Sequence, residues 1–304
     1  MSLPKTISSG TSLPLAEELA QSMYRYAPNR GERALDSALE DAFRQTGRLS
    51  RGLLAARTAL ATGLERETAL RFGCALEYWH LASLILDDLP CMDDAMRRRG
   101  APCLHRIHGE STALLAAMAL LNRAYQLAGT ALARFPVAAR LEALTGMGEL
   151  LGPEGILGGQ SLDLQYDPEQ GALRAPGRIA WLKTGSLLWL AVKLPTTGRS
   201  SPSERLELRR LAVYWGVAYQ LIDDLQDLRS DQDTGKDSNR DSLMNRPNTV
   251  STLGLTRAQA RLERLMRLAE ARLSNLSDRG ARWNYLREWQ QDVFAAALEV
   301  RHAA

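Results

Sequence analysis

The sequence has only three cysteines, Cys74, Cys91 and Cys103, and so small and odd a number does not suit a disulfide framework. A reducing setting is therefore expected, and we predict a cytoplasmic protein. Long apolar runs are also missing, because polar side chains interrupt even the most apolar stretch, residues 111–133. A bilayer span needs about 20 apolar residues without such breaks. We predict a buried core helix there, no signal peptide, and a protein that is not an integral membrane protein.

Strand signals are nearly absent too, since the chain shows no sustained alternation of polar and apolar residues and no Asn-Gly hairpin turn. Charge of one sign is not in excess: the formal net charge is only +3, which does not favour a nucleic-acid partner. Helical periodicity, by contrast, dominates the chain. One helical stripe near the C-terminus is formed by Leu262, Leu265, Met266, Ala269 and Leu273.

Breaks divide the chain into roughly ten helical segments, several of them longer than the average helix. Two capping boxes mark helix starts, one at residues 201–204 with proline in the first turn and one at residues 256–259. None of the breaks stands out as a domain linker. We therefore predict one all-α domain over residues 1–304, with residues 1–12 as a flexible N-terminus. The breaks fall near Pro90, residues 100–102, Pro136, residues 152–153, 165–178, 195–202 and 228–247.

An acidic cluster follows an apolar helical segment in the sequence LILDDLPCMDDAMRRRG. It places Asp87, Asp88, Asp93 and Asp94 within eight residues. Like charges this close repel one another, and acidic residues at a helix C-terminus oppose the helix dipole. A solvated helix end is the plain structural alternative. A bound cation would reverse the repulsion, so the cluster indicates a cation site.

A second acidic cluster lies in the sequence WGVAYQLIDDLQDLRSD. Gln220, Asp223 and Asp227 are spaced i, i+3 and i+7, which places them on one helix face, with Asp224 to the side. Oxygen-bearing side chains on a mostly apolar helix are costly to bury unless they bind something. Carboxylates without a cysteine or histidine cluster suit Mg²⁺, or alternatively Mn²⁺. Two facing clusters of this kind predict a diphosphate held between them through metal ions.

Basic residues beside both clusters support a bound diphosphate. Three arginines, residues 97–99, follow the first cluster, and Lys236 follows the second. Lys183 and Thr184 open a predicted helix after a loop. Each of these residues alone is explained as a solvated surface charge. Their shared placement beside the acidic clusters is what favours a diphosphate site.

In their order along the chain, these motifs resemble the trans-isoprenyl diphosphate synthase family, which includes farnesyl and geranylgeranyl diphosphate synthases. The family's first motif, D-D-x-x-x-x-D followed by two arginines, is matched by Asp87, Asp88, Asp93, Arg98 and Arg99. Its second motif, Q-x-x-D-D-x-x-D, is matched by Gln220, Asp223, Asp224 and Asp227. Between them stand GGQSLDL and Lys183-Thr184-Gly185, similar to the family's G-Q-x-x-D and K-T-G segments. The resemblance implies the isoprenoid synthase fold, with helices around a central substrate cavity, and a homodimer.

The resemblance also implies a role for each matched residue. Magnesium, as roughly three ions, would be bound by Asp87, Asp93 and Asp223, with Asp88 and Asp227 in support. The diphosphate of an allylic substrate would be contacted by Arg98, Lys183 and Lys236. The reacting end of its chain would be lined by Thr184 and Gln220. Isopentenyl diphosphate, the second substrate, would be held by Arg48, Arg51, His80 and Arg99.

Two of these assignments carry a departure or an alternative. Arg48 stands where the family's G-G-K-x-x-R segment usually has lysine, because this chain reads TGRLSR. Arginine keeps the charge but changes a compact ammonium into a planar guanidinium. His80 has an ordinary alternative as a core histidine. Its seven-residue offset from Asp87, however, places both side chains on one helix face.

The chain offers no convincing Ser, Cys or His nucleophile, and the resemblance implies a different chemistry. An allylic diphosphate ionises, the double bond of isopentenyl diphosphate attacks, and a proton is lost, which the released diphosphate takes. Product length depends on the residues one turn before Asp87, where Ala82 and Ser83 are both small. Family members that stop at fifteen carbons commonly carry an aromatic residue there. Its absence, with the two extra residues Pro90 and Cys91, resembles bacterial geranylgeranyl diphosphate synthases and predicts a twenty-carbon product.

Three alternatives stay open: a farnesyl diphosphate synthase, a class I terpene cyclase, and a non-catalytic subunit that binds diphosphates. A cyclase would normally carry an Asn/Ser/Glu-type second motif in place of Asp223 to Asp227. A non-catalytic subunit should have lost at least one aspartate cluster. Both clusters are intact, which favours the synthase.

Overall fold

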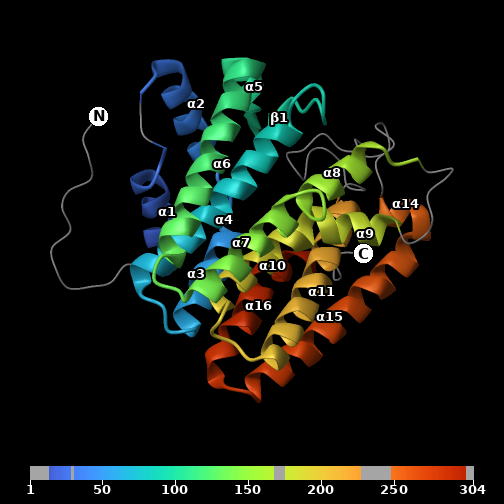
Figure 1. Cartoon of the computed structure of the whole chain (residues 1–304). Helices are drawn as coiled ribbons and strands as arrows, with labels where there is room; N and C mark the ends of the chain where they lie inside the picture. The colour runs from blue at the N-terminus through green and yellow to red at the C-terminus, as the bar shows by residue number, and fades with distance from the viewer. Residues whose placement is uncertain (1–13, 29–30, 168–174, 227–247, 299–304) are drawn as a thin grey trace.

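The computed structural model describes residues 14–28, 31–167, 175–226 and 248–298, and it is built almost entirely from helices (Figure 1). Of the predicted features, residues 1–12, Asp227 and Lys236 lie outside the described residues. The first elements are α1 (Leu15–Arg25), α2 (Arg33–Arg44), α3 (Ser50–Ala61), α4 (Arg66–Asp87), β1 (Arg97–Arg98), β2 (Ala101–Pro102), α5 (Leu104–His108) and α6 (Glu110–Leu132).

The chain continues through a further set of helices, one short segment of which is a π-helix, η1. These elements are α7 (Val137–Leu151), α8 (Ile156–Leu164), α9 (Ala175–Ala180), η1 (Trp181–Gly185), α10 (Ser186–Thr196), α11 (Pro202–Gln226), α14 (Thr249–Leu253), α15 (Leu255–Ser277), the 3₁₀ turn η2 (Ala281–Trp283) and α16 (Tyr285–Leu298). The strands β1 and β2 form a two-residue antiparallel ladder. The all-α fold predicted from the sequence is confirmed.

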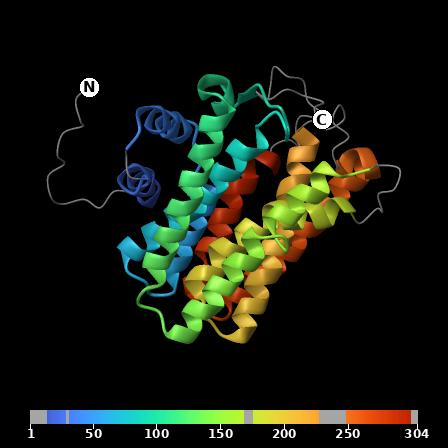
Figure 2. The ribbon, with the colours of Figure 1, turned by 45° about the horizontal axis from the view of Figure 1, so that its top comes forward.

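Helix α4 packs against both α3 and α6 (Figure 2). Most of its side chains are apolar. Its side chains Phe72, Tyr78 and Trp79 are buried among these neighbours. Helix α6 meets α4 through a stripe of mostly small side chains at helical spacing, which lets the two backbones approach closely. The stripe consists of Ala113, Ala116, Ala117, Leu120, Ala124, Leu127, Ala128 and Ala131. Because both flanks of α4 are covered, its C-terminal end at Asp87 is held firmly in place.

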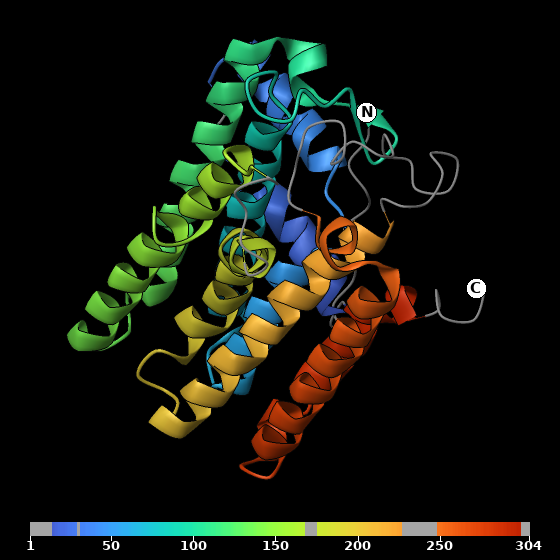
Figure 3. The same cartoon turned by 90° about the vertical axis from the view of Figure 1, so that its right-hand side faces the viewer.

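The C-terminal half forms a second group of helices, in which α11 and α15 lie side by side (Figure 3). The predicted stripe on α15 buries Leu262, Ala269 and Leu273. The first capping box is confirmed: Ser201 Oγ accepts from the N–H of Glu204, and the N–H of Ser201 donates to the Glu204 carboxylate. The second is wrong, because α15 begins at Leu255 behind Gly254, whose φ of 80° ends the preceding turn.

Helix α10 joins the two groups, since it contacts α3 and α4 on one side and α11 on the other. Pro195 lies in its last turn, so the predicted break begins only after Thr196. In the described residues, no helix is both long enough and apolar enough to cross a membrane. Helix α6 is the core helix predicted for residues 111–133, but one face of it is exposed at Leu114, Leu115 and Met118.

Candidate active site

One cavity of about 650 Å³ opens between α4 and α11 and receives most of the predicted site residues. Those that line it are Arg51, His80, Ser83, Asp87, Asp93, Arg98, Arg99, Lys183, Thr184, Gln220 and Asp223. Four predicted residues do not line it: Arg48, Ala82, Asp88 and Asp224. The fold therefore brings together segments that are more than 170 residues apart in the sequence.

A single face of α4 forms one wall of the cavity. His80, Ser83 and Asp87 follow one another at intervals of three and four residues, so they lie on one stripe. This confirms that the seven-residue offset places His80 and Asp87 on the same helix face. Ala82, by contrast, is fully buried in the core. Of the two residues predicted to control product length, only Ser83 reaches the cavity.

The loop after α4 folds back over the helix end. The N–H of Asp93 donates to the carbonyl of Asp87, and the N–H of Ala95 donates to the carbonyl of Asp88. These bonds satisfy carbonyls that the helix end leaves free, and they place the Asp93 carboxylate beside that of Asp87. Asp94 adopts a φ of 45° to make the turn, and its side chain pairs with Arg106 instead.

Asp88 is buried against Arg98, in a two-pronged contact. The Nε of Arg98 lies 3.0 and 2.9 Å from the two carboxylate oxygens of Asp88, and Nη2 lies 2.7 Å from Oδ1. Burial lowers the pKa of Arg98, but its hydrogen bonds to Asp88 and the charge of Asp88 outweigh this and raise it. Geometry therefore makes Asp88 the residue that orients Arg98 at the cavity wall; its support of a metal ion stays a prediction.

Lys183 faces Asp87 across the cavity and is held by Asp163, a residue of α8 that the sequence analysis did not assign. Lys183 Nζ donates to Asp163 Oδ2 at 2.7 Å. Burial lowers the pKa of Lys183, but Asp87 and Asp163 outweigh burial and raise it. Burial raises the pKa of Asp87 to about 6, against the lowering effect of Lys183. The signal for Asp163 was its place in GGQSLDL, three residues after the cavity-lining Gln160.

We predicted that Lys183 and Thr184 open a helix, and this is wrong. They lie in the π-helical segment η1, between α9 and α10. A π-turn adds one residue to the helical turn, so both side chains can face the cavity. Glycines allow the neighbouring helices to press on this wider turn. A Cβ on Gly159 of α8 would lie 2.6 Å from the N of Lys183, and one on Gly216 of α11 would lie 2.5 Å from the Cα of Gly185.

The opposite wall is one face of α11. Gln220 and Asp223 line the cavity together with Tyr219. Asp224 is fully buried behind them: one carboxylate oxygen accepts from Gln220 Nε2 at 3.1 Å and the other from the N–H of Thr249 at 2.7 Å. Asp224 therefore fixes Gln220 and the start of α14, and its side chain does not enter the cavity.

A positively charged corner lies where α3 meets α4. Arg51 Nη1 lies 3.2 Å from His80 Nε2, and the Arg51 guanidinium sits over the ring of Tyr219 at 5.3 Å. Burial and then Arg51 lower the pKa of His80 well below its ordinary value, so the imidazole is neutral at pH 7. Because a guanidinium only donates, His80 Nε2 accepts this bond and carries no proton.

Arg99 and Arg48 complete this corner on its outer side. Arg99 donates to the carbonyl of Gln45, and its guanidinium packs so closely on Gly47 that a Cβ there would lie 2.6 Å away. Its own backbone has a φ of 52°. Arg48 is exposed, and its Nη1 lies 3.5 Å from the carbonyl of Asp292. Of the residues predicted to hold isopentenyl diphosphate, Arg48 is the one that does not line the cavity.

The far end of the cavity is apolar. Trp79 and Tyr125 meet there edge to face, with ring centroids 5.4 Å apart, and Leu121 lies beside them in the lining. Trp79 is 2% exposed, and it belongs to α4 one turn before Ser83. An aromatic pair therefore lines the cavity one turn deeper than Ala82 and Ser83.

The carboxylates suit magnesium bound together with a diphosphate. Asp87 and Asp93 on one wall face Asp223 on the other. Across the described ranges, no three Asp, Glu, His or Cys side chains converge on one point. Magnesium matches this pattern, because it usually takes one or two carboxylates and completes its shell with water and phosphate oxygens. The residues present therefore fit metal ions shared between protein and substrate.

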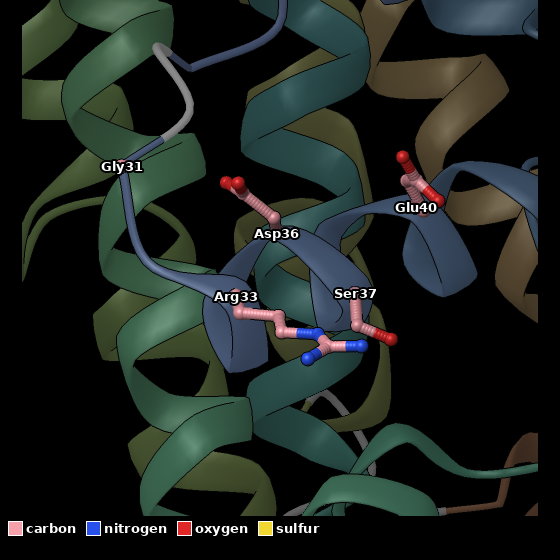
Figure 4. Close-up of a pocket in the computed structure, with 5 residues that line it drawn as sticks. All are labelled: Gly31, Arg33, Asp36, Ser37 and Glu40. Carbon is pink, nitrogen blue, oxygen red and sulfur yellow. The ribbon is translucent and has the colours of Figure 1, made fainter.

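A second hollow lies on the outer surface over α2 (Figure 4). Apart from Gly31, its lining belongs to α2, and the side chains of Arg33, Asp36 and Glu40 point in different directions (Figure 4). Nothing in this arrangement converges on a ligand, so the cavity at the end of α4 is the candidate site.

The sequence pattern of the polyprenyl synthetase family matches residues 32–279. The chain belongs to this family. It is 32% identical to a geranylgeranyl diphosphate synthase of Pantoea ananas over 93% of both chains. Membership confirms the resemblance seen in the motifs, the isoprenoid synthase fold, and an enzyme that transfers prenyl groups to extend a chain.

Two solved structures resemble the whole fold. The apo structure of an FPP/GFPP synthase from Zymomonas mobilis aligns with a TM-score of 0.76 at 30% identity, covering 90% of this chain and 93% of that one. A Helicobacter pylori geranyltransferase, solved with magnesium and isoprenyl diphosphate, aligns with a TM-score of 0.78 over 97% and 100% of the two chains. At 22% identity, the second likeness concerns the fold alone.

Proposed function

We propose that the enzyme condenses isopentenyl diphosphate with an allylic diphosphate and releases geranylgeranyl diphosphate. The observation that carries this proposal is the division of one cavity into three parts. Facing carboxylates and Lys183 form one part, a corner of Arg51 and Arg99 forms the second, and an apolar tunnel forms the third. Two diphosphates and one growing hydrocarbon chain need these three environments.

The allylic diphosphate belongs between the aspartates. Asp87, Asp93 and Asp223 would hold magnesium ions with it, and the Helicobacter geranyltransferase complex with magnesium and isoprenyl diphosphate supports this assignment. Bound magnesium would supply positive charge to the diphosphate as its C–O bond breaks. Lys183 and Arg98 add protein charge at the same place, since both are held there by carboxylates. The predicted contribution of Lys236 and Asp227 concerns residues outside the described part of the chain.

Isopentenyl diphosphate belongs at the positive corner. Arg51 and Arg99 supply two guanidinium groups, and neutral His80 holds Arg51. Guanidinium groups bind phosphate oxygens directly in a two-pronged manner. Because His80 Nε2 is occupied by Arg51, His80 is not placed as a general base. The released diphosphate is the proton acceptor that remains, as the family resemblance implies.

The tail of the allylic substrate belongs in the apolar tunnel. Thr184 and Gln220 line its entrance, and Leu121, Trp79 and Tyr125 line its end. Ser83 leaves space where a large side chain would shorten the tunnel. One helix turn rises about 5.4 Å, close to the length of one extended five-carbon unit. With Ser83 small and Trp79 one turn deeper, the tunnel holds one unit more than a tunnel closed at Ser83, which supports a twenty-carbon product.

The test uses purified protein with radiolabelled isopentenyl diphosphate, farnesyl diphosphate and Mg²⁺, followed by chromatography of the dephosphorylated products. We expect labelled geranylgeraniol, and no product in excess EDTA. With dimethylallyl or geranyl diphosphate as the starter, a product that stops at farnesol would favour the farnesyl synthase. Cyclic hydrocarbons would favour a terpene cyclase, and no turnover with any starter would favour a non-catalytic subunit.

We also propose that the enzyme is a homodimer. Two helices expose apolar side chains that a soluble monomer rarely leaves uncovered. These are Leu114, Leu115 and Met118 on α6 and Val137, Leu141 and Leu144 on α7. Light scattering on the purified protein should give twice the chain mass. Leu115→Glu should shift it towards the chain mass, and the monomer mass for the wild type would contradict the proposal.

A further inference from the structure

The first turn of α3, which carries Arg51, lacks a cap of its own. Leu49 occupies the N-cap position with φ 51° and ψ 32°, and its side chain makes no capping hydrogen bond. Helices usually begin at Ser, Thr, Asp or Asn, whose oxygen accepts one of the free N–H groups of the first turn. Leucine has no such oxygen. The N–H groups at this end need an acceptor from elsewhere in the fold.

That acceptor is Glu77 of α4. Its Oε1 accepts from the N–H of Gly52, the third residue of α3, at 2.6 Å. Glu77 is 5% exposed, so this is a carboxylate inside the core. Burial raises the pKa of Glu77, and the N–H of Gly52 and the charge of Arg51 act against burial. A carboxylate at a helix N-terminus is also stabilised by the helix dipole.

The contact depends on glycine. A Cβ on Gly52 would lie 2.6 Å from Glu77 Cγ and 2.7 Å from the carbonyl oxygen of Gly73. A Cβ on Gly73 would in turn lie 3.0 Å from the carbonyl oxygen of Gly52. The first of these distances to backbone is closer than real Cβ atoms come and the second is tighter than most real contacts, so the two glycines let α3 and α4 touch. The first turn of α3 is thereby pressed onto the side of α4 that carries Glu77.

The same turn delivers Arg51 into the cavity. His80 stands three residues after Glu77 on α4, so the two side chains hold α3 one above the other. Glu77 accepts a hydrogen bond from the backbone N–H of Gly52, and His80 accepts one from Nη1 of the Arg51 side chain. The Nε of Arg51 is buried with no hydrogen-bond partner among the described residues. A buried donor without a partner is costly, and a phosphate oxygen would satisfy it.

We propose that Glu77 is a positioning residue of the isopentenyl diphosphate site. Its carboxylate holds the first turn of α3 and so sets the Arg51 guanidinium against His80 and the incoming diphosphate. Glu77 itself does not line the cavity, and it acts through Arg51. The inference rests on the proposed function, because it takes Arg51 as a ligand of that substrate.

The test measures KM for isopentenyl diphosphate and KM for farnesyl diphosphate in Glu77→Gln, which keeps the shape of the side chain but replaces the acid with an amide. An amide holds the first turn of α3 less firmly than the native acid and so shifts the Arg51 guanidinium, and we expect KM for isopentenyl diphosphate to rise about tenfold. KM for farnesyl diphosphate should change less than about twofold, because its site lies on the other walls. Glu77→Asp, which is one methylene shorter, should show the same selective rise and decides the matter if Glu77→Gln does not fold.

Two controls separate positioning from general damage. Leu76→Ala removes the neighbouring buried side chain of α4, and it should lower the melting temperature without a selective change in either KM. In an Arg51→Ala background, Glu77→Gln should add less than about twofold to KM for isopentenyl diphosphate, because the side chain it positions is gone.

Three results would overturn the inference. KM for isopentenyl diphosphate could stay unchanged in both folded Glu77 variants, both KM values could rise together, or the effects of Arg51→Ala and Glu77→Gln could add fully. Each of these leaves the proposed function standing. Absence of turnover in the wild type would overturn the proposed function, and the role of Glu77 with it.

Discussion

The cationic side chains at the two charged ends of the cavity have different kinds of hydrogen-bond partner. At the aspartate end, the two described cations that we predicted to contact the allylic diphosphate each have a carboxylate within hydrogen-bond distance: Lys183 has Asp163, and Arg98 has Asp88. At the α3 end, Arg51 donates to neutral His80 and Arg99 donates to a backbone carbonyl, and neither forms a salt bridge within the described ranges.

This difference assigns a different binding mode to each end. Asp87, Asp93 and Asp223 add negative charge to an end where Lys183 and Arg98 are already paired, so under the proposed function a diphosphate would bind there together with metal ions. The guanidinium groups at the α3 end have no salt-bridge partner within the described ranges, so under the proposed function this end would bind a diphosphate without metal ions. Under the proposed function, this difference in charge would keep the two substrates apart within one cavity.

Removing a carboxylate from the aspartate end should have the largest effect. Asp87→Asn should lower kcat about 1,000-fold, because Asp87 would hold a magnesium ion. Without that ion, the diphosphate leaves with less positive charge around it. Steady-state assays with labelled isopentenyl diphosphate measure this. Asp94→Asn is the matched control from the same loop, since Asp94 pairs with Arg106 outside the cavity, and it should change kcat less than about threefold. Equal losses of kcat in the two variants would contradict the assignment of Asp87, but not Asp94, to the active site.

Removing a cation from the α3 end should affect one substrate selectively. Arg51→Ala should raise KM for isopentenyl diphosphate about 100-fold and KM for farnesyl diphosphate less than about threefold, since a two-pronged guanidinium contact is lost. Lys183→Ala should do the reverse. The pair of KM values in each variant checks this, and a variant in which both rise equally would show that the two ends do not bind separate substrates.

The apolar end should respond in product length. Ser83→Phe should shorten the product from twenty to fifteen carbons, because the new ring fills the tunnel one turn above Trp79. Ala82→Phe is the matched control: Ala82 lies in the core, so overpacking there should cost about 2 kcal/mol of unfolding free energy. Product chromatography and denaturant unfolding separate the two outcomes. If Ala82→Phe shortened the product and Ser83→Phe did not, the tunnel would run along the Ala82 face of α4, which would contradict the account.

The smallest effect on activity is expected for a buried carboxylate far from the cavity, Glu204 at the start of α11. Burial would raise its pKa, but hydrogen bonds from Arg282, Ser201 and Trp283 outweigh burial and lower the pKa to about 2. Its stabilising contribution is therefore complete above its unfolded pKa and is lost as the pH falls from about 4.5 to about 2.

Glu204→Gln should accordingly lose about 2 kcal/mol at pH 7, with kcat unchanged. The stability difference from the wild type should shrink as the pH falls below about 4. Urea unfolding at several pH values measures this. Glu65→Gln is the control, because the Glu65–Arg134 pair is exposed and should contribute less than about 0.5 kcal/mol. A constant difference from pH 7 to pH 3 would contradict the linkage.

The sequence predicted those site residues whose spacing alone decides which face they occupy. His80 and Asp87, and Gln220 and Asp223, reach the cavity because a helix of known period carries them there. Ala82 was misplaced because the stripe that ends at Asp87 passes through Ser83.

Tertiary contacts account for the rest. Asp163 and Glu77 act through Lys183 and Gly52, which belong to other helices. The GGQSLDL segment marks Asp163 itself, but no local pattern identifies the partner of either carboxylate. The π-turn that carries Lys183 and Thr184 packs against α8 and α11, where Gly159 and Gly216 leave room for it. The apolar pair of Trp79 and Tyr125 joins two helices in the same way. Such contacts depend on packing between segments distant in the sequence, which periodicity does not encode.

Calorimetric titration of each substrate, with Mg²⁺ and with excess EDTA, tests the central claim most directly. A non-ionising thiolo analogue of farnesyl diphosphate can stand for the allylic substrate. We expect EDTA to weaken the analogue at least about 100-fold and to leave the affinity for isopentenyl diphosphate within about twofold. The account would be contradicted if EDTA weakened the affinity for both ligands equally, or for neither.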